Sequence, residues 1–319
     1  MKKRKNNIIA LGILLIGLLL LSSCKAVSLT PPDFTNHQAH KLAKNKIKIG
    51  VSLSTLNNPF FISLKKGITQ EAKSNGSKVQ LFDAQNDSSK QNNDIEDLIQ
   101  KKVNVIIINP VDSDAIVPAV KDANAAGIPV IACDRGSNGG KLLTTVASNN
   151  VKAGKMAANF MKQKLNHGAK IAELEGTPGA DAAVQRGKGF NQDVKGNLKI
   201  VTKQSANFDR AKGMSTMENI LQAHPNINGV FSQNDEMALG AIKSINNPNL
   251  VVVSIDGEPQ GLKAVKQGKI TGIIAQEPIV EGELAVKAAY NYYSGKHVKK
   301  IIHSPIHLVT KTNVDKYLH

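Results

Sequence analysis

The segment Ile47–Phe61, IKIGVSLSTLNNPFF, decides the fold, because it joins an apolar run to a polar turn and then to the start of a helix. Its first half, IKIGVSL, has the composition of a buried strand. Asn57, Asn58 and Pro59 follow, and proline is favoured at the first position of a helix. Phe60 and Phe61 would then open that helix, although only 4% of the chain is aromatic. A strand that passes into a helix in this way is the unit of parallel α/β sheets.

The same unit recurs along the chain, as β-branched runs that alternate with amphipathic helical patterns. The runs are IKIGVSL, KVQLFDA, NVIIINP, IPVIACD, TTVAS, AKIAELEG, LKIVTKQ, NGVFSQN, LVVVSID and KITGIIAQ. One sheet of modest size does not hold so many strands, and the alternation restarts near Ser148 after the glycine-rich loop RGSNGGK. We therefore predict an α/β fold with two doubly wound parallel-sheet lobes.

The N-terminal segment has the pattern of an export signal. A Lys/Arg head precedes the apolar stretch from Ile8 to Leu21, which is short for a membrane span of about 20 residues. The sequence LSSC that ends at Cys24 resembles the lipobox of bacterial lipoproteins, which implies that Cys24 carries lipid outside the cytoplasm. We predict a signal peptide at residues 1–23 and a tether at residues 24–45, which contains a Pro-Pro pair. The alternative is a single-pass anchor with an incidental cysteine.

Charge and cysteine content narrow the class of protein further. The formal charge of +16 falls to about +12 once the signal peptide is removed, and the basic residues are scattered. Without an Arg-rich tract or zinc-finger spacing, we expect no nucleic-acid partner, and we expect contact with an anionic envelope surface. If Cys24 is lipidated, Cys133 has no partner, and its place in IPVIACD predicts a core position.

The sequence lacks the common signatures of catalysis and cofactor binding. The eight histidines show no ligand spacing, and neither a GxxxxGKS/T loop, a GxGxxG loop nor a GxSxG elbow is present. Asp134 and Asp256 could serve as the acid and base of a sugar-processing enzyme, but recognition of hydroxyl groups explains each of them better. We therefore expect a binding protein without metal or cofactor, and no enzyme.

The expected carboxyl ends of the strands are rich in polar planar side chains. Ligands of doubly wound sheets bind at these ends. They read STLNNPFF, INPVDSD, CDRGS, SQNDEM, SIDGEP and IAQEP. Asn and Gln both donate and accept hydrogen bonds, Asp accepts and Arg donates as a fork, so the set suits the hydroxyls of a sugar, whose C–H faces an aromatic ring can cover.

Several of these residues also have a purely structural interpretation. Phe60 and Phe61 could pack in the core of the first helix, and the pair that follows IPVIAC, Asp134 with Arg135, could be solvated. In SQNDEM we expect Asp235 to cap the next helix, which would leave its neighbour Asn234 free.

From about Lys48 to Val309 the chain resembles the D-ribose-binding proteins that feed bacterial ABC importers, which have the type I periplasmic-binding-protein fold. The resemblance rests on motifs that recur in order, namely STLNNPFF, INPVDSDA, RGKGF, NFDR, QNDEMALGA, DG-P and IAQ. It implies three crossovers between the lobes. The first lobe would comprise residues 46–148 plus 277–305, and the second residues 149–276 plus 306–319.

The resemblance also implies function and site residues. A monomer would close on D-ribose or a similar small sugar, and the closed form would be recognised by the membrane permease of an ABC importer. The implied sugar contacts come from both lobes: Ser54, Asn58, Phe60, Phe61, Asn109, Asp134 and Arg135 from the first, and Arg186, Phe208, Asn234, Asp256 and Gln276 from the second. Phe60 and Phe208 would cover opposite faces of the sugar. Ile255 stands where the family has phenylalanine, and we expect it at one edge of the sugar.

Three alternatives remain open. The ligand could be another pentose, allose or a furanosyl signalling molecule. Sugar-responsive repressors share this fold, but the signal peptide occupies the place of their helix-turn-helix. Lys25, at the second position of the mature chain, is not the aspartate that retains many lipoproteins at the inner membrane, which favours the surface of a one-membrane bacterium over a periplasmic location.

Overall fold

The computed structural model describes residues 41–318. The predicted signal peptide, Cys24 and most of the predicted tether lie outside the described residues. The end of the predicted tether packs on the folded body: Lys44–Lys46 form a short 3₁₀ helix, and the backbone N–H of Leu42 donates to the carbonyl of Tyr293 at 3.2 Å. Between residues 41 and 318, every helix is too short or too polar to cross a membrane.

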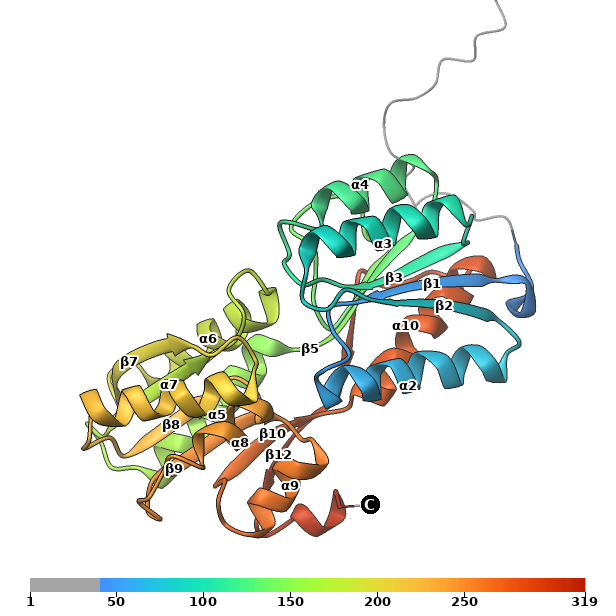
Figure 1. The fold of residues 1–319 in the computed structure, drawn as a ribbon. Helices are drawn as coiled ribbons and strands as arrows, with labels where there is room; N and C mark the ends of the chain where they lie inside the picture. The colour runs from blue at the N-terminus through green and yellow to red at the C-terminus, as the bar shows by residue number, and fades with distance from the viewer. Residues whose placement is uncertain (1–40, 319) are drawn as a thin grey trace, which may run out of the picture. The chain divides into compact units, whose positions relative to one another are not determined.

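Two six-stranded sheets form the folded body (Figure 1). Across the first sheet the order is β2 (Lys78–Asp83), β1 (Lys48–Leu53), β3 (Val105–Asn109), β4 (Val130–Cys133), β5 (Thr144–Ser148) and β11 (Ile301–Ser304). Across the second it is β7 (Lys199–Ser205), β6 (Lys170–Glu175), β8 (Gly229–Ser232), β9 (Val251–Asp256), β10 (Gly272–Gln276) and β12 (Ile306–Thr310). The second sheet repeats the order of the first, and all neighbours are parallel except β10 and β12. The predicted fold class is confirmed.

Helices cover both faces of each sheet, which explains the continuous apolar runs of the strands. In Figure 1, α2 (Pro59–Ser74) and α10 (Pro278–Tyr293) lie on one face of the first sheet, and α3 (Ser88–Gln100) and α4 (Val117–Ala125) on the other. The second sheet lies between α5 (Asn150–Lys164) with α6 (Asp181–Val194) and the group α7 (Arg210–Ala223), α8 (Asp235–Ala241) and α9 (Pro259–Lys266). Each of the four faces therefore has its own apolar core.

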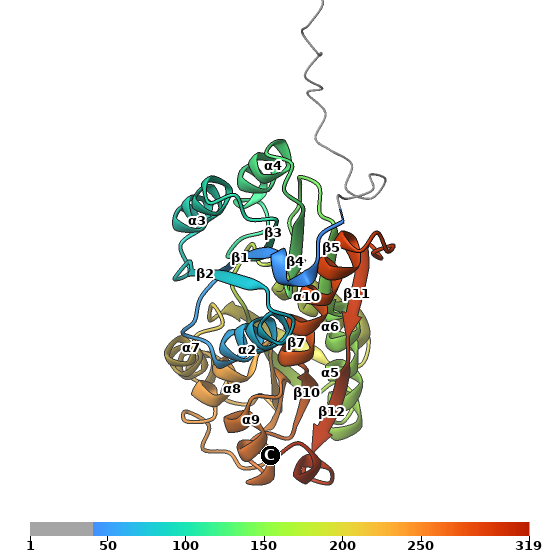
Figure 2. The ribbon, with the colours of Figure 1, turned by 90° about the vertical axis from the view of Figure 1, so that its right-hand side faces the viewer.

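The chain passes between the sheets three times. The first passage joins β5 to α5, the second joins β10 to α10, and the third joins β11 to β12 across Pro305, as Figure 2 shows for the C-terminal part of the chain. The hydroxyls of Ser148 and Ser304 lie 2.9 Å apart, so a hydrogen bond joins the first passage to the third. These passages connect the sheets near the strand ends that carry the predicted binding residues.

Candidate ligand-binding site

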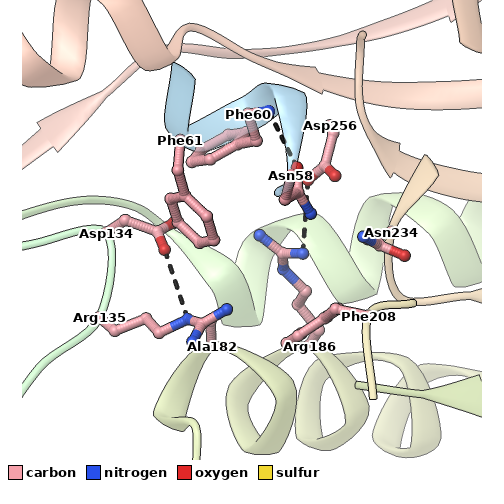
Figure 3. A pocket seen from close by; sticks show the side chains of 10 residues that line it. All are labelled: Asn58, Phe60, Phe61, Asp134, Arg135, Ala182, Arg186, Phe208, Asn234 and Asp256. Carbon is pink, nitrogen blue, oxygen red and sulfur yellow. Dashed lines mark hydrogen bonds and ion pairs between the residues drawn. The ribbon is translucent and has the colours of Figure 1, made fainter. Parts of the chain in front are cut away.

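The strand ends of both sheets border one cavity, which Figure 3 shows from close by. It is lined by Asn58, Phe60, Phe61, Asp134, Arg135, Ala182, Arg186, Phe208, Asn234 and Asp256. The cavity and its opening to solvent together contain about 260 Å³ that is free of protein atoms, so the site suits only a small ligand. Every lining residue except Ala182 belongs to the set predicted to contact a sugar; the contact itself stays a prediction.

The two phenylalanines of the opening segment serve the core and the cavity together. The side chain of Asn58 accepts a hydrogen bond from the backbone N–H of Phe60 at 2.9 Å and caps α2, while Pro59 occupies its first turn. The rings of Phe60 and Phe61 meet edge to face with centroids 5.4 Å apart, and both pack in the core between α2 and the first sheet. Both rings also line the cavity, so packing in the core fixes the position of this part of the cavity wall.

Asp134 is held in place by two residues behind the cavity. The hydroxyl of Ser54 donates to Asn109 Oδ1 at 2.6 Å, and Asn109 Nδ2 donates to Asp134 Oδ2 at 3.0 Å. Ser54 and Asn109 are completely buried and are not among the lining residues. Asp134 itself has φ +66°, a strained conformation for a residue other than glycine that is often found at functional sites. The structure therefore places Ser54 and Asn109 as supports of Asp134.

The guanidinium of Arg135 lies between two aromatic rings that come from different sheets. Its carbon is 5.0 Å from the ring centroid of Phe61 and 5.3 Å from that of Phe208. One nitrogen donates to the Pro110 carbonyl at 3.2 Å, and Nε lies 3.6 Å from Asp134 Oδ2. Asp134 and Arg135 are 4% and 5% exposed, so the interpretation as a solvated pair is wrong. Burial lowers the pKa of Arg135, and the charge of Asp134 opposes that effect.

Arg186, in α6, is fixed by acceptors from three separate segments. Its Nε donates to Asn150 Oδ1 at 2.9 Å, and its two terminal nitrogens donate to the Gln233 carbonyl at 2.6 Å and to Gln276 Oε1 at 2.7 Å. Gln276, which was predicted to contact the sugar, is not among the lining residues and holds this arginine. Its buried Nε2 has no hydrogen-bond partner among residues 41–318.

Asp256 ends β9 and forms an ion pair with Arg186. Its Oδ1 lies 3.5 Å from an Arg186 nitrogen, and both side chains are 4% exposed. Burial raises the pKa of Asp256 well above its ordinary value, whereas the charge of Arg186 lowers it. Asp256 has φ +137° and is followed by Gly257 with φ +88°, so this carboxylate, like that of Asp134, projects from a strained turn.

The cap of α8 differs from the prediction. The side chain of Asn234 accepts from the backbone N–H of Met237 at 2.9 Å and caps the helix, while its buried Nδ2 has no partner among the described residues. The predicted cap, Asp235, accepts instead from the hydroxyl of Ser254 and from two backbone N–H groups in the turn between β9 and α9. The assignment of Asp235 as the cap is wrong because that turn, distant in sequence, satisfies its carboxylate.

Phe208 depends on a glycine that the sequence did not single out. A Cβ atom on Gly176 would lie 2.0 Å from Phe208 Cζ, so only glycine lets the ring occupy this position. Phe208 has φ +56°, and its ring also faces the Arg186 guanidinium at 5.8 Å. The sequence analysis did not identify Gly176 and Ala182 as site residues, because a small side chain carries no chemical signal of its own.

Ile255 does not lie at the edge of the cavity. Its side chain is completely buried and packs with Phe190, Phe231 and Ile274 between the second sheet and the helices α5 and α6. Side chains alternate along a strand, so Asp256 faces the cavity and Ile255 points to the opposite face of the sheet. The expectation that Ile255 shapes one edge of the sugar is wrong.

The composition of the cavity suits a neutral ligand rich in hydroxyl groups. The formal charges of Asp134 and Asp256 balance those of Arg135 and Arg186. These four groups offer acceptors and donors, Asn234 adds a free donor, and the rings offer apolar faces. Among residues 41–318, no three His, Cys, Asp or Glu side chains are grouped as a metal ion would require. Cys133 lies buried in β4, as predicted, and burial raises its pKa.

The model of the periplasmic binding protein domain matches residues 49–297. The chain is 51% identical to the ribose import binding protein RbsB of Bacillus subtilis (strain 168) over 94% of this chain and 97% of the relative, and 42% identical to that of Escherichia coli (strain K12) over 86% and 93%. A solute-binding protein of an ABC transporter from Actinobacillus succinogenes, solved with bound D-allose, superposes with a TM-score of 0.79 at 31% identity, over 85% of this chain and 100% of that chain. The chain therefore belongs to the periplasmic binding protein family.

Proposed function

We propose that the protein binds D-ribose between its two sheets and delivers it to the permease of an ABC importer, without chemical change to the sugar. The observation that carries this proposal is the cavity itself, in which charge-balanced Asp and Arg side chains from both sheets converge with two sets of aromatic rings. The ribose import binding proteins, at 51% and 42% identity over most of the chain, support ribose as the sugar.

In this proposal the sugar lies between Phe60 and Phe208. Its hydroxyls donate to Asp134 and Asp256 and accept from the arginines and from Asn234 Nδ2. Because Phe208 and Asp256 belong to the lobe of the second sheet and Phe60 and Asp134 to the lobe of the first, the full set of contacts exists only when the two lobes face each other. Binding therefore shifts the population toward the closed form, which the permease recognises.

Isothermal titration with D-ribose, D-allose, D-xylose and myo-inositol tests the proposal. We expect the tightest binding with D-ribose and recovery of the sugar unchanged. Tighter binding of another sugar would overturn the assignment of ribose, and a product recovered after incubation would overturn the assignment as a binding protein. D-allose is the strongest rival because the structural relative described above contains it.

We infer that the units that move in closure are residues 46–148 with 277–305 and residues 149–276 with 306–319. The strands of the two sheets divide between these units, which supports the boundaries. Small-angle scattering should show a smaller radius of gyration with ribose than without it, at a molecular mass that matches a monomer. An unchanged radius with saturating ribose would contradict the closing motion, and a doubled mass would contradict the monomer.

We also infer an extracytoplasmic location with a lipid anchor on Cys24. The apolar segment and the sequence LSSC before the folded body support this inference. Cys24→Ala should abolish fatty-acid labelling and release the protein from the membrane, whereas Cys133→Ala should leave both unchanged. Labelling that persists in Cys24→Ala would contradict the anchor.

A further inference from the structure

Glu258 makes a contact between the two sheets that the sugar site does not require. It lies in the turn between β9 and α9, and its Oε1 accepts a hydrogen bond at 3.2 Å from the backbone N–H of Phe60 in α2. The same N–H also donates to the cap residue Asn58, so Glu258 is a second acceptor at the start of α2. Because the partners belong to the lobes of different sheets, this hydrogen bond would form only in the closed arrangement of the proposed closure.

The closed arrangement also buries the carboxyl group of Glu258. The residue is 6% exposed, and its Oε2 is buried without a hydrogen-bond partner among residues 41–318. An ionised carboxylate oxygen that loses water without gaining a donor is costly. A protonated carboxyl avoids this cost, because its O–H group is itself a donor and the carbonyl oxygen still accepts from the N–H of Phe60.

The charged groups around Glu258 are mostly acidic. Asp256 ends β9, and Asp235 and Glu236 begin α8. Asp256 is paired with Arg186, and Glu236 accepts from Arg210 Nε at 3.0 Å, so these two arginines already have anionic partners.

On the opposite side, the N-terminus of α2 contributes no titratable side chain. Its partial positive charge favours an ionised carboxylate. Burial and the three acidic neighbours act in the opposite sense and raise the pKa of Glu258 to about 10.

We propose that Glu258 is a positioning residue for closure that accepts a proton as the cleft shuts on the sugar, so that ligand binding takes up a proton. The inference rests on the proposed closure around a sugar. In the open form, water reaches the carboxyl, which is then largely ionised at neutral pH; in the closed form it is neutral. Protonation therefore favours the closed form, and affinity decreases as the pH rises from the open-state pKa toward the closed-state pKa.

Titration calorimetry with D-ribose at pH 7, in phosphate and in Tris, measures the proton uptake, because these buffers differ in their enthalpy of ionisation. Glu258→Gln keeps the acceptor oxygen and supplies a permanent donor, so it imitates the protonated residue. We expect it to bind ribose and to take up at least about half a proton less than the wild type. Glu96→Gln, which removes an exposed carboxylate on α3, is the matched control and should behave as the wild type.

The pH profile provides a second measurement. Between pH 6 and pH 8, the dissociation constant of the wild type should increase at least about threefold more than that of Glu258→Gln. Asp256 and the other buried acids are present in both proteins, so the difference reports on Glu258 and on its coupling to these acids. Equal proton uptake and parallel pH profiles in the two proteins would overturn the inference. Absence of ribose binding by the wild type would instead overturn the proposed function.

Discussion

The two arginines of the cavity are held in different ways. Arg186 donates to acceptors from α5, from the end of β8 and from the end of β10, and it pairs with Asp256. Arg135 donates to one carbonyl, its Nε has no hydrogen-bond partner among the described residues, and its guanidinium is held mainly by two rings, of which Phe208 belongs to the other sheet. The partners of Arg186 all belong to the lobe of the second sheet, whereas Arg135 contacts rings from both lobes and, under the proposed closure, would have complete surroundings only in the closed form. We therefore expect Arg186 to keep its position with and without ligand, and the contacts of Arg135 to depend on closure.

Replacement of Arg186 should have the largest effect on the affinity for ribose. Arg186→Ala leaves the carboxylate of Asp256 and the amide oxygen of Gln276 buried without their donor, at a cost of about 3 kcal/mol or more. The affinity for ribose should decrease more than about a hundredfold in calorimetry. The loss should appear mainly as faster dissociation, because the contact with the sugar forms on closure.

Lys90→Ala is the control for Arg186→Ala. It removes a lysine that pairs with the buried Asp94 on α3, away from the cavity, and it should leave affinity unchanged. If Arg186→Ala bound ribose as tightly as this control, Arg186 would not be part of the site.

Truncation of Arg135, the arginine between two rings, should weaken ribose binding less than truncation of Arg186. Arg135→Ala loses two cation–π contacts, each worth about 0.5–2 kcal/mol, and one donor to the sugar, so we expect affinity to decrease roughly tenfold to a hundredfold. In the background Phe208→Ala the same truncation should cost less, because one ring contact is already absent. Additive losses in this double-mutant cycle would show that Arg135 does not depend on the opposite sheet.

A substitution that moves the Phe208 ring without replacing Phe208 tests the contact between Arg135 and Phe208 more directly. In Gly176→Ala the new methyl group would overlap the ring, and such overpacking costs about 1–3 kcal/mol. We expect about tenfold weaker ribose binding. In the background Phe208→Ala the substitution should have little further effect, and an equal loss in both backgrounds would place the cause outside the ring.

The support behind Asp134 should have the smallest effect on binding. Ser54→Ala removes the hydrogen bond to Asn109, worth about 1 kcal/mol, and leaves Asp134 in place, so affinity should decrease only about fivefold. A loss as large as that of Arg186→Ala would mean that Ser54 contacts the sugar directly, as the family resemblance implies.

The fold was largely predictable because the central strands of each parallel sheet are buried on both faces and consist of consecutive apolar residues. All the apolar runs from IKIGVSL to KITGIIAQ are strands β1 to β10. The strands β11 and β12 were not identified, because they are shorter than the other edge strands, β2 and β7, and mix apolar with polar residues around Pro305. An edge strand is only half covered and lacks the continuous apolar signal.

The site was predictable where a side chain carries its own chemistry and less so where tertiary contacts decide. The strand ends identified Asp134 and Asp256, but the exchange of roles between Asn234 and Asp235 depends on a turn distant in sequence. The error at Ile255 was avoidable, since the alternation of side chains in β9 already turns it away from Asp256.

A crystal structure of the protein with D-ribose is the most direct test of the account. We predict the sugar between Phe60 and Phe208, with its hydroxyls on Asp134, Asp256, Arg135 and Arg186, and with Ser54, Asn109 and Ile255 out of contact. Ribose bound to another surface, or held in this cavity by Ser54 and Asn109 while Arg186 makes no contact with it, would contradict the account.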